Sequence, residues 1–331
     1  MSLVFLFPGQ SSRYPGMLDK LVDLHAPNAE VLEQASDILD WDLAHQFSVD
    51  NTEAFSRNVD VQVGVFLANH MFLRRLQAEG IDADTSMGLS LGEYSHLVHI
   101  GALGFEDALR LVYARGEAYD NGPRGWMASI QPIDLEELQT VLADINAKGD
   151  LGVVEAVNLN SPRQHVISGD QAAVEAAMAV LEDEHYVQPV VIEKQVPMHS
   201  TKFEPVGATF RESLEAAAFM PPRKPYVPNR LGETLKDPSR EQFVNLLAEH
   251  IYQPVLWRKS IDHVLERDPD AVFVEVGPRS VLHNLLHRKW VRNRKFHTDS
   301  REETAAHLDG VLTQLRELTH GVVAEPRFSA G

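Results

Sequence analysis

Hydrophobic and polar positions along the chain alternate between strand and helix periods. An apolar run at residues 3–7 predicts a buried first strand, and apolar residues at helical spacing over 61–79 predict a long helix. Residues 85–89 predict a second strand that leads directly into a helix over 91–100. Because strands that alternate with helices favour a mainly parallel sheet, this pattern predicts an α/β fold.

The middle of the chain has a different order of elements. Short strands and helices follow one another as β-α-β-β-α-β, which is the split pattern of a ferredoxin-like subdomain. The predicted strands are at 126–131, 151–158, 164–169 and 187–192, and the helices at 134–148 and 171–184. The larger pattern then resumes, with a strand at 271–276 and helices at 203–217, 240–252, 256–266, 280–289 and 302–318. We therefore predict a large core formed by residues 1–125 and 199–331, with an inserted subdomain at 126–198.

Composition narrows the class of protein. The 331 residues suffice for about two domains, and 44% apolar with 24% charged residues is typical of globular chains. A net charge of −18 argues against a nucleic-acid partner. The absence of cysteine excludes disulfides, thiolate metal sites and a cysteine nucleophile, and it is compatible with a cytoplasmic location. No apolar run approaches the roughly 20 residues of a membrane span.

The clearest local motif is Gly88-Leu89-Ser90-Leu91-Gly92, between a predicted strand and a predicted helix. A Gly-x-Ser-x-Gly segment in this context is typical of a nucleophile elbow, which exposes the serine hydroxyl beside a helix N-terminus. The pentapeptide alone could equally be a structural turn. The strand–turn–helix context favours the nucleophile.

A serine nucleophile needs a base, and the sequence offers 15 histidines. His199 lies where a predicted strand ends beside Pro197 and a helix begins, and α/β sheets place catalytic groups at such strand ends. Spacing alone does not single it out. His96 and His99 are helix neighbours but lack a third ligand nearby, so no metal site is predicted.

Separated segments carry a wider resemblance. In chain order they are Phe7-Pro8-Gly9-Gln10, Gln62, Gly88-Leu89-Ser90-Leu91-Gly92-Glu93-Tyr94, Ala114-Arg115-Gly116, Asn158-Leu159-Asn160-Ser161-Pro162, Val196-Pro197-Met198-His199-Ser200, Tyr252-Gln253-Pro254-Val255-Leu256-Trp257 and Glu275-Val276-Gly277-Pro278. Together they resemble the malonyl-CoA:acyl-carrier-protein acyltransferase family over about residues 3 to 300. The resemblance implies an α/β-hydrolase-like core with a ferredoxin-like subdomain and a cleft between them.

The resemblance also implies roles for single residues. Ser90 would be the nucleophile and His199 the general base, oriented by the backbone carbonyl of His250. The backbone N–H groups of Gln10 and Leu91 would form the oxyanion hole.

The substrates follow from the same resemblance. Arg115 would bind the free carboxylate of a malonyl group, and Gln62 would be an active-site glutamine. The implied substrate is malonyl-CoA, a coenzyme A thioester, with no tightly bound cofactor. The implied partner is an acyl carrier protein with its phosphopantetheine arm.

Some residues depart from the family pattern around the acyl pocket. Leu89 stands where histidine is usual, Tyr119 where methionine is usual, and Met198 where a small or aromatic residue is common. The leucine-containing elbow resembles stand-alone acyltransferases of trans-acyltransferase polyketide synthases, which favours polyketide over fatty-acid biosynthesis. Three alternatives stay open: transfer of a non-malonyl acyl group between carrier proteins, an editing acyl hydrolase, and a non-catalytic docking module.

A dense basic run could meet an acidic carrier protein or a phosphate of coenzyme A. It contains Arg288, Lys289, Arg292 and Arg294, with Trp290 as a candidate anchor. A solvated helix end would explain the run equally well. Arg163, on the turn of the predicted subdomain, is a weaker docking candidate.

Overall fold

The sheet that contains the first strand is parallel throughout its described residues. In the computed structural model, which describes residues 2–300 and 302–320, it has the strand order β2-β1-β7-β8. Its strands are β1 (Leu3–Phe7), β2 (Thr85–Gly88), β7 (Val272–Glu275) and β8 (Lys295–His297). Each neighbouring pair is parallel, which confirms the predicted α/β class.

Both faces of this sheet are covered. Within β1, Leu3, Phe5 and Phe7 pack into one core cluster, while Val4 and Leu6 pack into another on the opposite face. Successive side chains of a strand point to opposite faces, so a continuous apolar run is what a strand buried on both sides requires. The first cluster contains residues of α4 (Asn58–Ala78), α5 (Gly92–His99), α6 (Phe105–Asp120), α9 (Glu204–Ala216) and α10 (Arg240–Glu249), and the second those of α11 (Trp257–Arg267) and α12 (Val281–Leu285).

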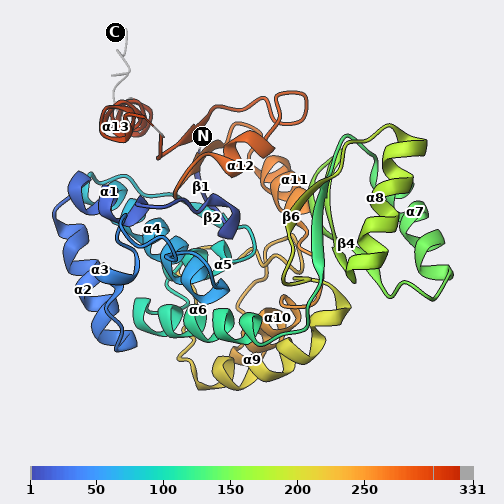
Figure 1. Cartoon of the computed structure of the whole chain (residues 1–331). Coiled ribbons are helices and arrows are strands. Elements are labelled where there is room, and N and C mark those ends of the chain that lie inside the picture. The colour runs from blue at the N-terminus through green and yellow to red at the C-terminus, as the bar shows by residue number, and fades with distance from the viewer. Residues whose placement is uncertain (1, 301, 321–331) are drawn as a thin grey trace, which may run out of the picture.

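The second sheet is antiparallel and has the strand order β4-β5-β3-β6. It consists of β3 (Trp126–Ile130), β4 (Val154–Ser161), β5 (Gln164–Gly169) and β6 (Val190–Glu193), with helices α7 (Leu135–Ala147) and α8 (Gln171–His185). In Figure 1 these two helices lie on the outer side of the sheet, away from the rest of the molecule. The order of elements confirms the ferredoxin-like pattern. The subdomain boundaries stay a prediction, and residues 321–331 lie outside the described residues.

Several local predictions were incomplete. The remaining elements are η1 (Gln10–Ser12), α1 (Met17–Leu24), α2 (Pro27–Leu39), α3 (Leu43–Gln46), η2 (Thr201–Phe203) and α13 (Thr304–His320). Helix α1 and strand β8 were not predicted. The helix expected over 280–289 ends at Leu285, because Leu286 and Val291 turn back into the core beneath β7. Helix α10 ends at Glu249 rather than at 252.

The topology brings strand ends together. Phe7 lies opposite Gly88 and Leu6 opposite Glu275, so the segments after β1, β2 and β7 leave the sheet at the same edge. Open parallel sheets place their ligands at this carboxyl edge. Within the described part of the chain, no helix is long and apolar enough to cross a membrane.

Asp120 fixes α4 against α6, the two helices that carry Gln62 and Arg115. Its carboxylate accepts hydrogen bonds from the backbone N–H groups of Asn58 (2.8 Å) and Val59 (3.1 Å) at the start of α4. We expect Asp120→Ala to lower the free energy of unfolding by about 2 kcal/mol, because both N–H groups lose a charged acceptor. Urea unfolding measures the change. Asp144→Ala, at an exposed position of α7, is the control, and an equal effect of both substitutions would contradict the prediction.

Candidate active site

Ser90 lies on a tight turn between β2 and α5. Its φ of 51° is in the left-handed region, where a residue with a side chain is strained. The flanking glycines permit the turn: a Cβ on Gly88 would lie 2.0 Å from backbone atoms of Gly92, and one on Gly92 would lie 2.0 Å from the Phe7 carbonyl oxygen. This is the geometry of a nucleophile elbow, as predicted from the sequence.

His199 is within hydrogen-bond distance of the nucleophile. Its Nε2 lies 2.8 Å from Ser90 Oγ, and its Nδ1 lies 2.6 Å from the backbone carbonyl oxygen of His250. Because a carbonyl can only accept, Nδ1 carries the proton and Nε2 is free to accept the proton of Ser90. The carbonyl is available because α10 ends at Glu249, so the last-turn acceptors have no partner within the helix.

The environment of His199 keeps its ring neutral. Burial, and next the positive charge of Arg115, lower its pKa to about 3. A neutral imidazole at physiological pH is the form that can act as a general base.

Arg115 is fully buried beside the nucleophile. Its guanidinium donates to Gln62 Oε1 at 2.7 Å and to Ser90 Oγ at 3.3 Å, and it lies 4.4 Å from the centre of the Tyr119 ring. All three neighbours are neutral, and the guanidinium Nε has no partner. The structure therefore brings the predicted residues Arg115, Gln62 and Tyr119 together with Ser90.

Gln10 is the first residue of η1, and Leu91 is the N-cap residue of α5. A backbone N–H at a helix start has no acceptor within its own helix, so both donors are available. Gln10 and Ser90 line the same cavity, and a Cβ on Gly9, the residue before Gln10, would lie 2.8 Å from the Leu89 carbonyl oxygen. The close approach of these turns is what a pair of oxyanion donors requires.

Two residues that the sequence analysis did not assign hold the elbow from behind. Asn229 accepts the Ser90 backbone N–H at 2.8 Å and donates to the Gly88 carbonyl oxygen at 2.6 Å. Glu93 is 1% exposed and contacts Asn229 and His250. Asn229 follows a proline in an irregular segment, so no periodic pattern in the sequence marks it.

A cavity of about 250 Å³ opens above the dyad. Its floor is formed by the elbow and His199, and its opposite wall by side chains of β3, β4 and β5, including Met127, Asn160 and Gln164. Leu89 and Met198, two of the positions that depart from the family pattern, both line it. The nucleophile thus lies between the two sheets, with a wall on each side.

Comparisons with known proteins agree with this geometry. The family model described as "Acyl transferase domain" matches residues 4–306. The chain therefore belongs to the acyl transferase family.

Similar proteins cover nearly the whole chain. The malonyl CoA-acyl carrier protein transacylase of Bacillus subtilis (strain 168) is 29% identical over 89% of this acyltransferase and 92% of its own length. PksC, the polyketide biosynthesis malonyl CoA-acyl carrier protein transacylase of the same organism, is 30% identical, with 86% and 96% covered. The crystal structure of the transacylase from Clostridium perfringens has a TM-score of 0.88 at 26% identity, covering 98% of this chain and all of that one (100%).

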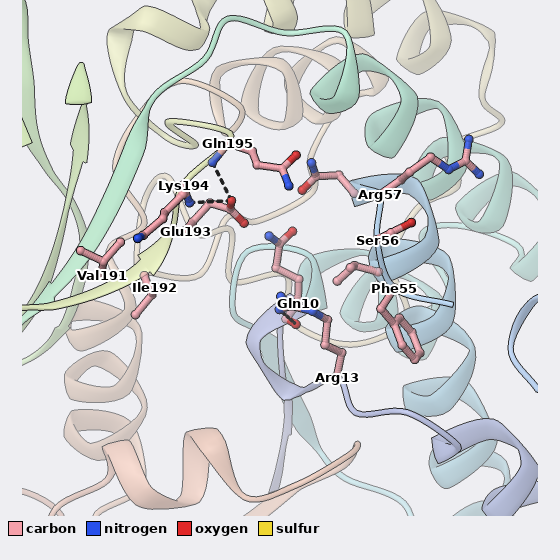
Figure 2. A pocket seen from close by; sticks show the side chains of 12 residues that line it. Gln10, Arg13, Phe55, Ser56, Arg57, Val191, Ile192, Glu193, Lys194 and Gln195 are labelled. Atoms are coloured by element: carbon pink, nitrogen blue, oxygen red, sulfur yellow. Dashed lines mark hydrogen bonds between the residues drawn. The ribbon is translucent and has the colours of Figure 1, made fainter. Parts of the chain in front are cut away.

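A second hollow, of about 310 Å³, adjoins the catalytic cleft of the acyltransferase. Figure 2 shows Gln10 and Arg13 on one side of it, Phe55–Arg57 on another, and the segment from Val191 to Gln195 opposite. The two cavities share Gln10, Arg13, Ile192 and Glu193. Arg13, Arg57 and Lys194 border this second hollow, which we call the mouth of the site, and Arg57 is paired with Asp60 at 2.9 Å.

The predicted docking residues are more dispersed. Arg288 and Lys289 are exposed after α12, whose Val281 and Leu285 line the cleft. Arg292 and Arg294 border a hollow with Pro269 and Asp270, at the amino end of β7 and so at the opposite edge of the sheet from Ser90.

Arg163 lies on the β4–β5 turn and pairs with Asp134 at 3.6 Å. Trp290 is not a free anchor, because its indole N–H donates to Asp262.

We expect Asn229→Ala to weaken both stability and catalysis. The substitution leaves the Ser90 N–H and the Gly88 carbonyl unpaired in a buried place, at a cost of about 2 kcal/mol or more. Urea unfolding and the rate of acylation of Ser90 measure the two effects. Asn121→Ala, which removes one exposed side-chain hydrogen bond, should change stability by less than about 0.5 kcal/mol. An Asn229 variant with wild-type stability and acylation rate would contradict the prediction.

Proposed function

We propose that this acyltransferase moves a malonyl group from malonyl-CoA to the phosphopantetheine thiol of an acyl carrier protein, and that it serves polyketide biosynthesis. The observation that carries the proposal is the isolated charge of Arg115. This guanidinium is fully buried, lies 3.3 Å from Ser90 Oγ and takes part in none of the ion pairs of the described residues. A buried cation without an anion is costly, and the free carboxylate of a malonyl ester would supply the anion.

The first half-reaction forms an ester on the enzyme. Ser90 Oγ attacks the thioester carbonyl while His199 Nε2 takes the hydroxyl proton. The negative charge on the carbonyl oxygen is stabilised by the backbone N–H groups of Gln10 and Leu91. When the carbon–sulfur bond breaks, the coenzyme A thiolate leaves with the proton from His199, and the malonyl group stays on Ser90.

The second half-reaction reverses these steps with a different thiol. His199 accepts the proton of the phosphopantetheine thiol, and the sulfur attacks the Ser90 ester. The Ser90 oxygen then leaves and regains its proton from His199. Every proton and acyl group is accounted for in these steps, which need no metal or redox cofactor. Because the enzyme carries the acyl group between two substrates, this order of steps predicts ping-pong kinetics.

The polyketide assignment rests on the elbow and on one relative. Leu89 replaces the usual histidine, and PksC is named as a polyketide enzyme. The other relative from Bacillus subtilis is named without a pathway, so the choice of carrier protein distinguishes polyketide from fatty-acid biosynthesis.

Radiolabelled malonyl-CoA tests the chemistry. We expect the wild type to acquire label, Ser90→Ala to acquire none, and Arg115→Ala to load malonyl about a hundredfold more slowly because the substrate carboxylate loses its partner. Acetyl-CoA provides the matched substrate, since its acyl group lacks the carboxylate; Arg115→Ala should lose far less activity toward it.

Other results would select another function. Labelling that survives Ser90→Ala would contradict the nucleophile, and preference of the wild type for acetyl over malonyl would contradict the substrate. Release of free malonate rather than transfer to a carrier would indicate a hydrolase. No labelling by any acyl thioester would indicate a docking module.

The cations at the mouth of the cleft predict where an acidic carrier protein approaches. We expect Lys194→Glu to raise the KM for the carrier protein several-fold while malonyl loading changes little, with a stronger effect at low salt. Lys148→Glu makes the same charge change at an exposed position after α7 and is the control. Equal effects of the two substitutions on the KM would contradict docking at this mouth. The predicted run from Arg288 to Arg294 can be tested in the same assay.

A further inference from the structure

A buried carboxyl group lies behind the dyad, and the reaction described above does not use it. Glu93 is in the first turn of α5, three residues after Ser90, and is 1% exposed. Burying a carboxylate is costly unless it is hydrogen-bonded, so its partners indicate what it does.

Glu93 has three partners. The Tyr226 hydroxyl donates to Oε1 at 2.7 Å, and the Asn229 backbone N–H donates to Oε2 at 3.4 Å. The Nδ1 of His250 lies 3.2 Å from the same Oε2, a close polar contact without the geometry of a hydrogen bond. His250 is itself buried, and within the described part of the chain Glu93 is the only carboxyl group within 4 Å of its ring nitrogens.

Two of these residues contact the dyad: Asn229 contacts Ser90, and His250 contacts His199. The Asn229 side chain holds the backbone N–H of Ser90 at 2.8 Å. The His250 ring stacks on the His199 ring, with centres 5.0 Å apart and planes inclined by 26°, while the His250 carbonyl orients His199 Nδ1. Glu93 therefore contacts both supports.

We propose that Glu93 is a positioning residue of the dyad, which holds Ser90 through Asn229 and His199 through His250 and whose negative charge favours the imidazolium formed during catalysis. The inference rests on the Ser–His acylation of the proposed function. In a serine triad a carboxylate bonds the histidine directly. Here the backbone carbonyl of His250 bonds His199, and the carboxylate of Glu93 contacts the His250 ring, which stacks on His199.

The charges around Glu93 determine when it can act. Burial raises its pKa to about 7, opposed by the hydrogen bonds from Tyr226 and Asn229 and by the charges of Arg115 and Arg230. A raised pKa means that the carboxylate is present above about pH 7 and becomes neutral as the pH falls through that value.

The other groups that face this cluster do not titrate in the same range. Burial lowers the pKa of His250 well below its usual value and that of His199 to about 3. Burial raises the pKa of Tyr94 and of Tyr226, so both phenols stay neutral. A loss of dyad reactivity with a midpoint near pH 7 would therefore report on Glu93.

The test measures how fast Ser90 reacts with a fluorophosphonate probe between about pH 5.5 and pH 8.5, with malonyl loading measured in parallel. We expect the wild-type rate to rise with pH around a midpoint near 7. Glu93→Gln, which cannot ionise, should lack this midpoint. It should match the wild type near pH 6 and fall about tenfold below it near pH 8.

A purely structural role gives a different result. If Glu93→Gln lowers the rate by the same factor at every pH and keeps the midpoint, the proposal is wrong. Glu275→Gln is the matched control, because Glu275 is also buried with a raised pKa but binds the backbone N–H groups of Leu282 and His283 instead of the dyad. It should keep the wild-type midpoint.

Two substitutions at His250 test the connection to His199, since both keep the backbone carbonyl. His250→Gln keeps a polar N–H group beside Glu93 and should retain a midpoint near 7. His250→Leu offers none, so the carboxylate is less stable and the midpoint should move to higher pH. A midpoint unchanged in His250→Leu would overturn this connection.

The probe separates this inference from the proposed function, because it carries no acyl group. A probe rate that titrates near pH 7 without any malonyl loading would leave the role of Glu93 standing and refute the substrate. Malonyl loading together with a probe rate that does not change with pH would support the substrate and refute the role of Glu93.

Discussion

The site depends on how closely three backbone segments approach one another at the carboxyl edge of the parallel sheet. At Gly88 and Gly92 no side-chain atom fits between β1, β2 and α5, since a Cβ would lie 2.0 Å from neighbouring backbone. This contact forces the turn that puts Ser90 in a left-handed conformation and aims its hydroxyl at the cleft. It also places the start of α5 beside the residues that follow β1, so one packing arrangement positions both Ser90 and the proposed oxyanion donors.

Two buried charged side chains lie close to this turn. Arg115 and Glu93 are both buried. Arg115 lies 3.3 Å from Ser90 Oγ, where we propose that the acyl carboxylate binds, and Glu93 contacts Asn229 on the other side of the turn. The guanidinium of Arg115 suits an anionic acyl group. The carboxylate of Glu93 lies where it can stabilise the positive charge that the proposed reaction places on His199. The acidic surface implied by the net charge of −18 is thus compatible with acidic partners, because the cations that matter are inside the cleft and at its mouth.

Much of this was predictable from the sequence, for physical reasons. The apolar run of β1 is continuous because both faces of the strand are buried, and the glycines around Ser90 mark a turn that few other residues permit. The residues that the sequence did not reveal act through contacts far along the chain. Asn229 and Ser90 are 139 residues apart, and no local pattern reports such a pair. The end of α10 was placed three residues too late, because a helical pattern continues past the point where the His250 carbonyl is needed.

The use of a backbone carbonyl to orient His199 has a consequence for how the enzyme can evolve. In a triad, one codon change removes the orienting carboxylate. Here every amino acid at position 250 carries the same carbonyl, so no point mutation deletes the acceptor that His199 uses. The side chain at position 250 can therefore vary and change the surroundings of His199. The hydrogen bond that fixes the tautomer of His199 stays, because it is made by the main chain.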